Sequence, residues 1–329
     1  MTSATGEGAA ARPFVLPVGG YAPRDTAHGA GLGAFRAAVM EGSGGAIDVP
    51  VTWNILDEGR PVTDLFELVE SGEMFMCYFS TSYQGARVPE LNIIEVPFMF
   101  DDLASAHAAL DGDLGAHLTS AVRASTGFEM LGYWDNGFRH FTNRLRSVRR
   151  PEDCAGMTVR LQPNLYHEEM IRGWGAIPVA VELKAAIELI STGQVDAQEN
   201  PLANTVAYGV DRVHRHVTMT GHLYGARGLF ANRVMFERLP AELREIVVRA
   251  AARAVALQRR LAAESERELR IQLESAGLEF VDLSDEEKSA FREASRPAVE
   301  LARRNLGEGL FALAETAKQG GGQTGGGPP

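Results

Sequence analysis

Polar side chains suited to binding a small anion occur in three segments in the middle of the chain. The first segment, residues 132–143, places aromatic side chains, amides and Arg139 around a glycine. In the second, Arg160 lies in a short apolar run that predicts a strand. A guanidinium is always charged and offers a planar pair of donors to a carboxylate. Arg160 is therefore a candidate anion ligand, although an arginine in such a strand can also simply face solvent.

The third segment, residues 193–201, predicts a strand directly before a polar Gln-Glu-Asn-Pro turn. Ligands in open α/β sheets lie beyond the carboxyl ends of the strands. Asn200 is thus a candidate hydrogen-bond partner for a ligand, although the tendency of asparagine to form turns also explains its presence.

The sequence contains no common hydrolase, kinase or metalloenzyme signature. It has no GxSxG, HExxH, GxxxxGK[ST] or strand-linked GxGxxG pattern. His214 and His216 are close in sequence but lack a third ligand, so we interpret them as surface histidines. We accordingly expect no catalytic residues, no metal and no cofactor.

The elements that position these residues follow an α/β pattern. Short Val, Ile, Phe and Met runs fill the first two thirds of the chain, and helix-forming residues dominate the last third. Residues 67–74 resemble residues 188–195, and each segment ends a helix at a glycine before a short apolar strand. This repeated unit suggests two similar lobes.

A very long helical pattern runs from Pro240 to about Ser275 with one apolar stripe. A helix of this length is roughly 50 Å long, longer than one lobe, so it is expected to span both. The alternative is two helices with a break near Ala263.

Composition excludes several functional classes. The net charge of −11 and the pI of about 5.3 argue against a long nucleic-acid surface, which needs basic residues. One buried arginine still suffices for a small anion. No apolar run reaches the ~18 residues of a membrane span, and two cysteines are too few for a disulfide framework.

Both ends of the chain have compositions unsuited to packing. Residues 1–12 are predicted to be disordered, and the Gly-rich residues 318–329 to form a flexible tail. No basic region followed by an apolar stretch marks a secretory signal. We therefore expect either a cytoplasmic protein or a leader that is removed or lies upstream of the sequence given.

Motifs along the chain resemble, in order and spacing, those of the substrate-binding proteins of tripartite ATP-independent periplasmic (TRAP) transporters, of the DctP type. The resemblance covers about residues 15–315. The segments that carry it are residues 96–100, 137–143, 151–160, 175–178, 194–201, 220–222 and 239–240.

This resemblance implies a two-lobe α/β fold like that of periplasmic binding proteins, with crossing strands and a long helix spanning both lobes. Lobe I is expected to comprise residues 13–136 and about 224–263, and lobe II residues 137–223 and about 264–317. The protein is expected to capture a small organic carboxylate between the lobes and deliver it to TRAP membrane subunits. This implies a periplasmic location, and we expect a monomer that binds no nucleic acid.

Matching positions assign roles to three polar residues. Arg160 corresponds to the arginine that clamps the ligand carboxylate, Arg139 to a second arginine near the ligand, and Asn200 to a recurring ligand contact. Leu183 stands where the family often has an aromatic residue, so the ligand is expected to differ from familiar ones.

Further pocket residues follow less directly from the resemblance. The loops at residues 21–28 and 79–82 match ligand-contacting loops of the first lobe, and three aromatic residues match pocket walls. The side chains nominated in this way are His28, Ser80, Ser82, Trp134, Tyr166 and Tyr224.

Two other functions stay open at the level of sequence. One is an enzyme on a related scaffold, such as a lyase or isomerase of small acids, which needs a general acid or base in the pocket. The candidates for that role are His28, Asp135 and Glu199. The other is a cytoplasmic carboxylate sensor, which explains the missing leader.

Overall fold

The computed structural model describes residues 12–320 of the 329-residue chain. The predicted disordered segment, apart from Arg12, and most of the predicted tail lie outside the described residues. The last helix, α12 (Glu308–Gly320), continues past the point at residue 318 where the sequence predicts a tail to begin. Lysine and glutamine at residues 318 and 319 favour helix and extend it.

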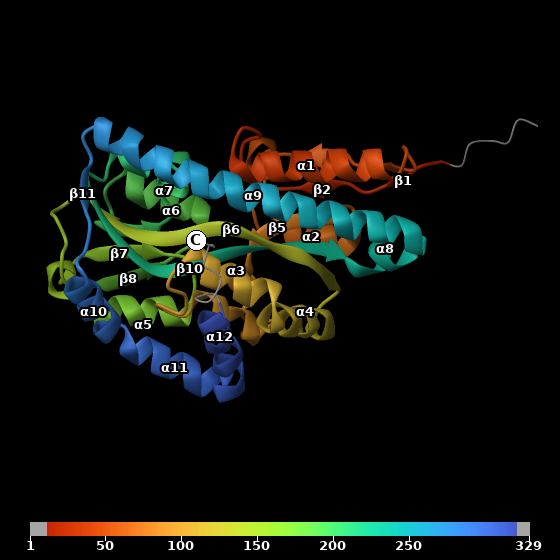
Figure 1. Cartoon of the computed structure of the whole chain (residues 1–329). Helices are drawn as coiled ribbons and strands as arrows, with labels where there is room; N and C mark the ends of the chain where they lie inside the picture. The colour runs from red at the N-terminus through yellow and green to blue at the C-terminus, as the bar shows by residue number, and fades with distance from the viewer. Residues whose placement is uncertain (1–11, 321–329) are drawn as a thin grey trace, which may run out of the picture.

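Strands of the described residues form a nine-stranded mixed sheet and a separate two-stranded pair, β1 with β3 (Figure 1). The order in the large sheet is β4-β2-β5-β10-β6-β9-β7-β8, and β11 pairs with β10 beside this path. The strand bounds are β1 Phe14–Val15, β2 Val18–Gly19, β3 Ile47–Asp48, β4 Val51–Thr52, β5 Met76–Ser80, β6 Phe128–Asn143, β7 Thr158–Leu161, β8 Ile177–Ala180, β9 Ala197–Asn200, β10 His216–Asn232 and β11 Glu279–Val281.

The long strands β6 and β10 run antiparallel through the whole molecule and connect its two ends (Figure 1). At one end β10 pairs with β5, and at the other β6 pairs with β9. A register shift in the middle leaves Asn136 without a partner on β10, a β-bulge beside Gly137. These strands confirm the predicted fold of two lobes joined by crossing strands.

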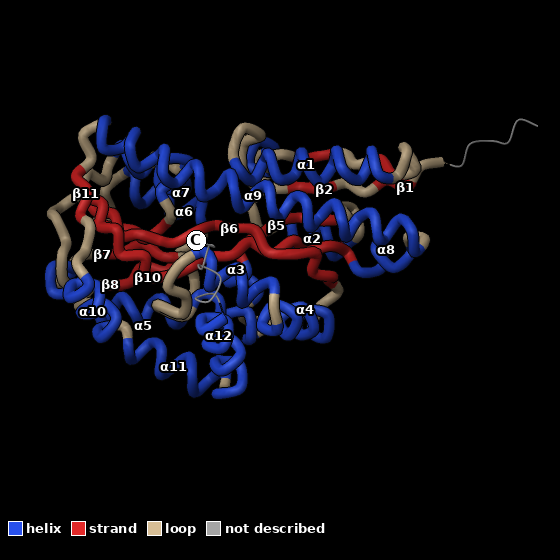
Figure 2. The backbone as a smooth tube through the Cα atoms, in the orientation of Figure 1, coloured by secondary structure: helices blue, strands red, loops and turns tan. Residues whose placement is uncertain are grey.

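Helices cover both faces of the sheet. Figure 2 shows α1, α6, α7 and α9 on one side and α3, α4, α5 and α10 to α12 on the other. The remaining helix bounds are α1 Ala27–Gly42, α2 Asp64–Ser71, α3 Leu103–Asp111, α4 Asp113–Ser125, α5 Leu165–Gly173, α6 Leu183–Ser191, α7 Leu202–Ala207, α8 Arg233–Arg238, α9 Ala241–Ser275, α10 Asp285–Ala294 and α11 Arg296–Leu306.

Helix α9 confirms the predicted long helix. It spans 35 residues without a break at Ala263, and Pro240 is its N-cap residue. Its small buried residues, among them Ala250 and Ala254, let it pack closely on α1 and β6. Figure 1 shows it running along the sheet from α8 at one end to β11 at the other. None of the helices between residues 12 and 320 combines the length and apolar character needed to cross a membrane.

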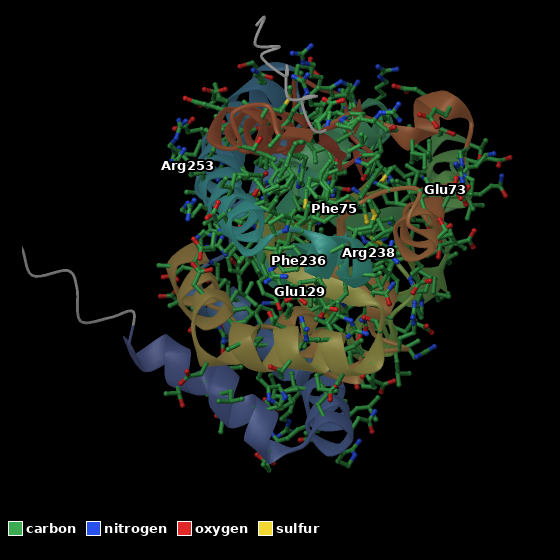
Figure 3. All side chains as sticks on the ribbon, turned by 90° about the vertical axis from the view of Figure 1, so that its right-hand side faces the viewer. Glu73, Phe75, Glu129, Phe236, Arg238 and Arg253 are labelled. Atoms are coloured by element: carbon green, nitrogen blue, oxygen red, sulfur yellow. The ribbon has the colours of Figure 1, made fainter. Side chains whose placement is uncertain are left out.

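Buried apolar side chains form one large cluster around β2, β5 and α1 and a second around β7, α5 and β11. The view along the sheet in Figure 3 shows Phe75, the residue before β5, in the interior, with Glu73 and Arg253 at the periphery. Two smaller clusters, one around Leu202 and Val217 and one around Ile190 and Val195, add to these, and α12 returns to pack on α3 and α4. The residue boundaries of the lobes stay a prediction.

Two details of the sequence interpretation are wrong. The Gln-Glu-Asn residues predicted as a turn form the strand β9 itself, because each of these buried polar side chains finds a polar partner inside the protein. His214, interpreted as a surface histidine, is fully buried, where its Nδ1 bonds to the hydroxyl of Thr142 at 2.9 Å. The local pattern reveals neither Arg139 as the partner of Glu199 nor Thr142 as the partner of His214, since both are distant in sequence.

Candidate functional site

A small polar cavity lies where β5, β6, β7, β9 and β10 come together. It encloses about 30 Å³, room for only a few water molecules. Among the predicted residues, Ser80, Arg139, Arg160 and Asn200 line it. Its other lining residues are Tyr21, Val62, Phe79, Tyr83, Asn136, Gln162, Leu183, Asn204, Tyr208 and Arg227.

Arg139 forms a buried ion pair with Glu199. Its Nε and Nη2 donate to the two carboxylate oxygens, and Nη2 also donates to the Glu199 carbonyl at 2.7 Å. Burial disfavours the charge of Glu199, but Arg139 and His222 together hold the pKa of this carboxyl well below its ordinary value. Arg139 is therefore neutralised within the protein.

Arg160 occupies the same cavity without any such partner. Its Nη2 donates to the carbonyl of Val181 at 2.8 Å, while its Nε has no hydrogen-bond partner. Burial lowers the pKa of this guanidinium, which is only 3% exposed. A buried charge without a counter-ion is costly, so the site favours an anion beside Arg160.

Amide side chains form one wall of the cavity. Asn204 donates from Nδ2 to both Asn200 and Asn136 at 3.1 Å, and Asn200 in turn donates to Gln198. Asn136 is the bulge residue of β6, so the break in strand pairing directs its side chain toward the cavity. These amides offer hydrogen bonds to a ligand without adding charge.

Glu95 lies behind the cavity and is completely buried. It accepts hydrogen bonds from Ser80 at 3.3 Å and from Gln162 at 2.6 Å. Burial raises the pKa of Glu95 to about 7, and nearby Arg139 opposes that shift. Glu95 therefore carries a proton in part of the population near neutral pH.

Some predicted residues lie elsewhere. Ser82 contacts Ser80 at 3.0 Å but faces a separate cavity that Tyr166 also lines. His28 lines a larger cavity, of about 870 Å³, between α3, α9 and α10. These three residues are therefore not brought together with Arg160.

The remaining predicted aromatic walls are core residues. Trp134 is fully buried behind Tyr78, and their ring centroids are 5.2 Å apart. The Tyr224 hydroxyl donates to Asp135 at 2.5 Å, and Asp135 also bonds to His107. Trp134 and Tyr224 do not line the Arg160 cavity.

The sequence interpretation missed several cavity residues, above all Arg227. Arg227 lies in β10 within an apolar run, and no motif distinguishes it from a solvent-facing strand arginine. Gln162 directly follows the strand that holds Arg160, and its position beyond the end of that strand is a signal for a ligand-binding residue. Asn204 and Tyr208 lie on or just after the short helix α7, and a signal for them is lacking.

Comparison with known proteins gives consistent results. The profile of the family described as bacterial extracellular solute-binding protein, family 7 (DctP), matches residues 18–305. The C4-dicarboxylate-binding periplasmic protein DctP of Rhodobacter capsulatus is 26% identical over 311 residues, which is 94% of this chain and 92% of that protein.

Solved structures of TRAP periplasmic solute-binding proteins share the fold. One from Sulfitobacter sp. NAS-14.1, with bound beta-D-galacturonate, has a TM-score of 0.85 and 28% identity and covers 92% of this chain and 99% of that chain. One from Polaromonas sp. JS666, bound to D-erythronate, has a TM-score of 0.85 and 27% identity and covers 92% and 98%.

Proposed function

Because the chain belongs to the DctP family of solute-binding proteins of TRAP transporters, we propose that it captures a small organic carboxylate in the Arg160 cavity. The observation that carries the proposal is the buried guanidinium of Arg160, which has no counter-ion among the described residues. A ligand carboxylate supplies that counter-ion in a fixed, two-donor geometry. The galacturonate and erythronate held by the related structures are carboxylates of this kind.

The other cavity residues have supporting roles in this proposal. Asn200 and Ser80 offer hydrogen bonds, and the Arg139–Glu199 pair forms a rigid wall that orients polar groups around the ligand. Leu183 lines the cavity at the position where the family often has an aromatic residue, which favours a ligand of different shape.

We further propose that the protein acts in the periplasm as a monomer and passes its ligand to TRAP membrane subunits without transforming it. The family and its periplasmic relatives support this role. The carboxylate of Glu199, a candidate general base, forms an ion pair with Arg139. A general base needs a carboxylate that is free to accept a proton from the substrate, so this pairing argues against that role. For the lobes we propose the boundaries predicted above, with α12 assigned to lobe I because it packs on α3 and α4.

The proposal is tested by a thermal-shift screen with a library of small carboxylates, each matched to its uncharged amide. A ligand present at 100 times its Kd adds about 2.7 kcal/mol to the free energy of unfolding. We expect at least one carboxylate, and not its amide, to stabilise the protein, and NMR spectra to show that ligand unchanged after prolonged incubation. Conversion of the ligand supports the enzyme alternative, and a screen without any stabilising carboxylate contradicts the proposal.

A further inference from the structure

The larger cavity that His28 lines lies on the face of the crossing strands opposite the Arg160 cavity. It encloses about 870 Å³ between α3, α9 and α10 and is called the α9 cavity below. Its volume is within the range of small-molecule pockets. Successive side chains of a strand point to opposite faces. On β6, Arg139 accordingly lines the Arg160 cavity, while Phe138 and His140 line the α9 cavity.

His140 presents a buried hydrogen-bond donor to the α9 cavity. Its Nδ1 accepts from the Gly221 N–H at 3.2 Å, so the neutral ring carries its proton on Nε2. Burial lowers the pKa of His140 to about 3, which keeps the ring neutral. Nε2 lies 3.7 Å from Oε1 of Glu266, too far for a hydrogen bond, although the side chain is only 9% exposed. Within residues 12–320 this donor has no acceptor, which is costly for a buried group.

Glu266 of α9 faces the same cavity without a counter-ion. Its Oε1 accepts a hydrogen bond from the Leu202 N–H at 3.1 Å, and its ion-pair neighbour among the described residues is the neutral His140. Burial raises the pKa of Glu266 to about 7, an effect that the Leu202 N–H opposes and no neighbouring cation offsets. A cation beside Glu266 would keep the carboxylate ionised and strengthen its attraction for the Nε2 proton of His140. This end of the cavity therefore favours a positively charged group.

The charges around the rest of the α9 cavity also favour a cation. Six carboxyl groups and three basic side chains line it. Two of these bases are already paired, Arg270 with Asp282 at 2.6 Å and Arg292 with Asp101 at 3.1 Å. The third, Lys288, is exposed. An excess of carboxylates attracts cations and repels anions, so the α9 cavity selects positively charged ligands.

Apolar side chains line much of the remaining wall. Phe100, Leu103, Phe138 and Met219 contribute to it, and alanines at 262 and 263 leave space beside α9. A hydrated inorganic cation gains little from such a wall, whereas an apolar ligand body gains about 25 cal/mol for each Å² that it buries. Aromatic faces also attract ammonium groups. The lining therefore suits an organic cation.

We propose that the α9 cavity binds an organic amine, with its ammonium group on Glu266 and its apolar body against Phe138 and Met219. His140 supports this pair by donating from Nε2 to the carboxylate. The site goes beyond the proposed function and does not depend on it, since the two cavities lie on opposite faces of β6. The protein thus has one binding site for each sign of charge.

The test compares amines with alcohols of the same shape, which lack the charge. The pairs are benzylamine with benzyl alcohol, 2-phenylethylamine with 2-phenylethanol, and 4-phenylbutylamine with 4-phenylbutanol. Calorimetry near neutral pH, with ligand-observed NMR for weak binders, gives Kd for the wild type and for Glu266→Gln. Glu268→Gln is the matched control, because Glu268 is an exposed carboxylate of the same helix that does not line the cavity. Arg160→Gln shows whether the amines bind in the other cavity.

We expect the wild type to bind at least one amine tenfold or more tightly than its alcohol. Glu266→Gln should weaken that amine at least tenfold and leave the alcohol within threefold, which removes the preference. Glu268→Gln and Arg160→Gln should each bind the amine within threefold of the wild type. If Glu266→Gln does not unfold cooperatively, Ala262→Leu serves instead, because it narrows the cavity and should weaken the amine and the alcohol alike.

Equal affinity for amine and alcohol in every pair overturns the proposal, as does the absence of amine binding up to millimolar concentrations. An equal loss in Glu266→Gln and Glu268→Gln also overturns it, because it shows attraction to the whole acidic surface and not to one carboxylate. Unchanged binding in Ala262→Leu, or a loss of amine binding in Arg160→Gln, has the same consequence. The carboxylate screen tests the proposed function on the other face of β6, so either proposal can fail without the other.

Discussion

Arg139 and Arg160 carry the same charge in one cavity, but their surroundings predict opposite effects on stability. Arg139→Met leaves Glu199 buried without its partner, which should lower the free energy of unfolding by about 3–5 kcal/mol. Arg160→Met removes a buried charge that has no partner, so the unfolding free energy without ligand should stay equal or rise. Urea denaturation of both variants, without ligand, measures the two effects. A large loss of stability in Arg160→Met would show that Arg160 is paired with a counter-ion in the folded protein.

Ligand binding should depend on Arg160 in the opposite way. Arg160→Ala leaves the ligand carboxylate unpaired, a cost of about 3–5 kcal/mol that corresponds to roughly 10²–10³-fold or more in Kd. Arg160→Lys should recover only part of the affinity, since it keeps the charge but loses the planar pair of donors. Calorimetry with a carboxylate from the screen checks both values. Binding of Arg160→Ala within threefold of the wild type would rule out this arginine as the clamp.

Glu95 should make stability depend on pH in a defined window. Burial raises the pKa of Glu95 from 4.5 to about 7, so the folded protein holds this proton more tightly than the unfolded chain does. The resulting stabilisation is complete below about pH 4.5 and is lost as the pH rises to 7. The unfolding free energy of the wild type minus that of Glu95→Gln should therefore fall across this range and level off above it.

The difference between the two proteins is the appropriate measure for Glu95, because other groups titrate in the same range. Burial also raises the pKa of Glu266 to about 7 and lowers that of His167 to about 4. Urea titrations at several pH values give the difference directly. A difference that stays constant from pH 4.5 to 7 would mean that Glu95 is ionised throughout.

Long elements were predicted from the sequence far better than short polar ones. The apolar stripe and Pro240 located α9, and glycines at 72 and 193 located two helix ends, both with positive φ. Arg160 was placed correctly in a strand, because the residues of β7 other than Thr158 and the arginine are apolar. These features depend on neighbours in sequence, so a local pattern suffices.

The missed features depend on neighbours that are distant in sequence. The polar strand β9 forms because Arg139 compensates Glu199, and Arg227 faces the cavity because β10 pairs with β5. Tyr166 and Tyr224 were nominated by position alone, but helix and strand geometry direct them into other surroundings. Of the residues that line the cavity, the sequence thus nominated Ser80, Arg139, Arg160 and Asn200 and missed Arg227.

Helix α9 bonds to the backbone of the crossing strand β6 through two neighbouring side chains, Gln258 and Arg259, and Gln258 makes a paired contact. Its amide accepts from the Asp135 N–H at 2.9 Å and donates to the Asp135 carbonyl at 2.8 Å, next to the β-bulge. Gln258→Leu leaves both backbone groups buried and unpaired, and should lower the unfolding free energy by about 1–3 kcal/mol for each. Gln272→Leu on the exposed face of the same helix is the control. Equal unfolding midpoints in urea for both variants would show that the helix does not depend on Gln258.

The whole molecule should change shape when it binds. Asn204 bonds to Asn136 across the cavity and Gln162 to Glu95 behind it, and the enclosed volume of about 30 Å³ is too small for a sugar acid. Ligand entry therefore needs the lobes to separate, and ligand contacts to both favour closure. Small-angle X-ray scattering should show a smaller radius of gyration with a saturating ligand from the screen. Identical scattering profiles with and without ligand would contradict the proposal that the lobes close on the ligand.

The pairing of β5 with β10 also determines how the chain can be synthesised. Residues 76–80 of β5 bond to residues 227–231 of β10, and at about 5–20 residues per second the second strand follows the first by roughly 8–30 s. During that time β5, fully buried in the finished protein, can pair with β2 but not with β10. Neither end of the sheet can be completed before β10 is made, so we expect the apolar edge of β5 to be exposed to aggregation until about two thirds of the chain has been translated.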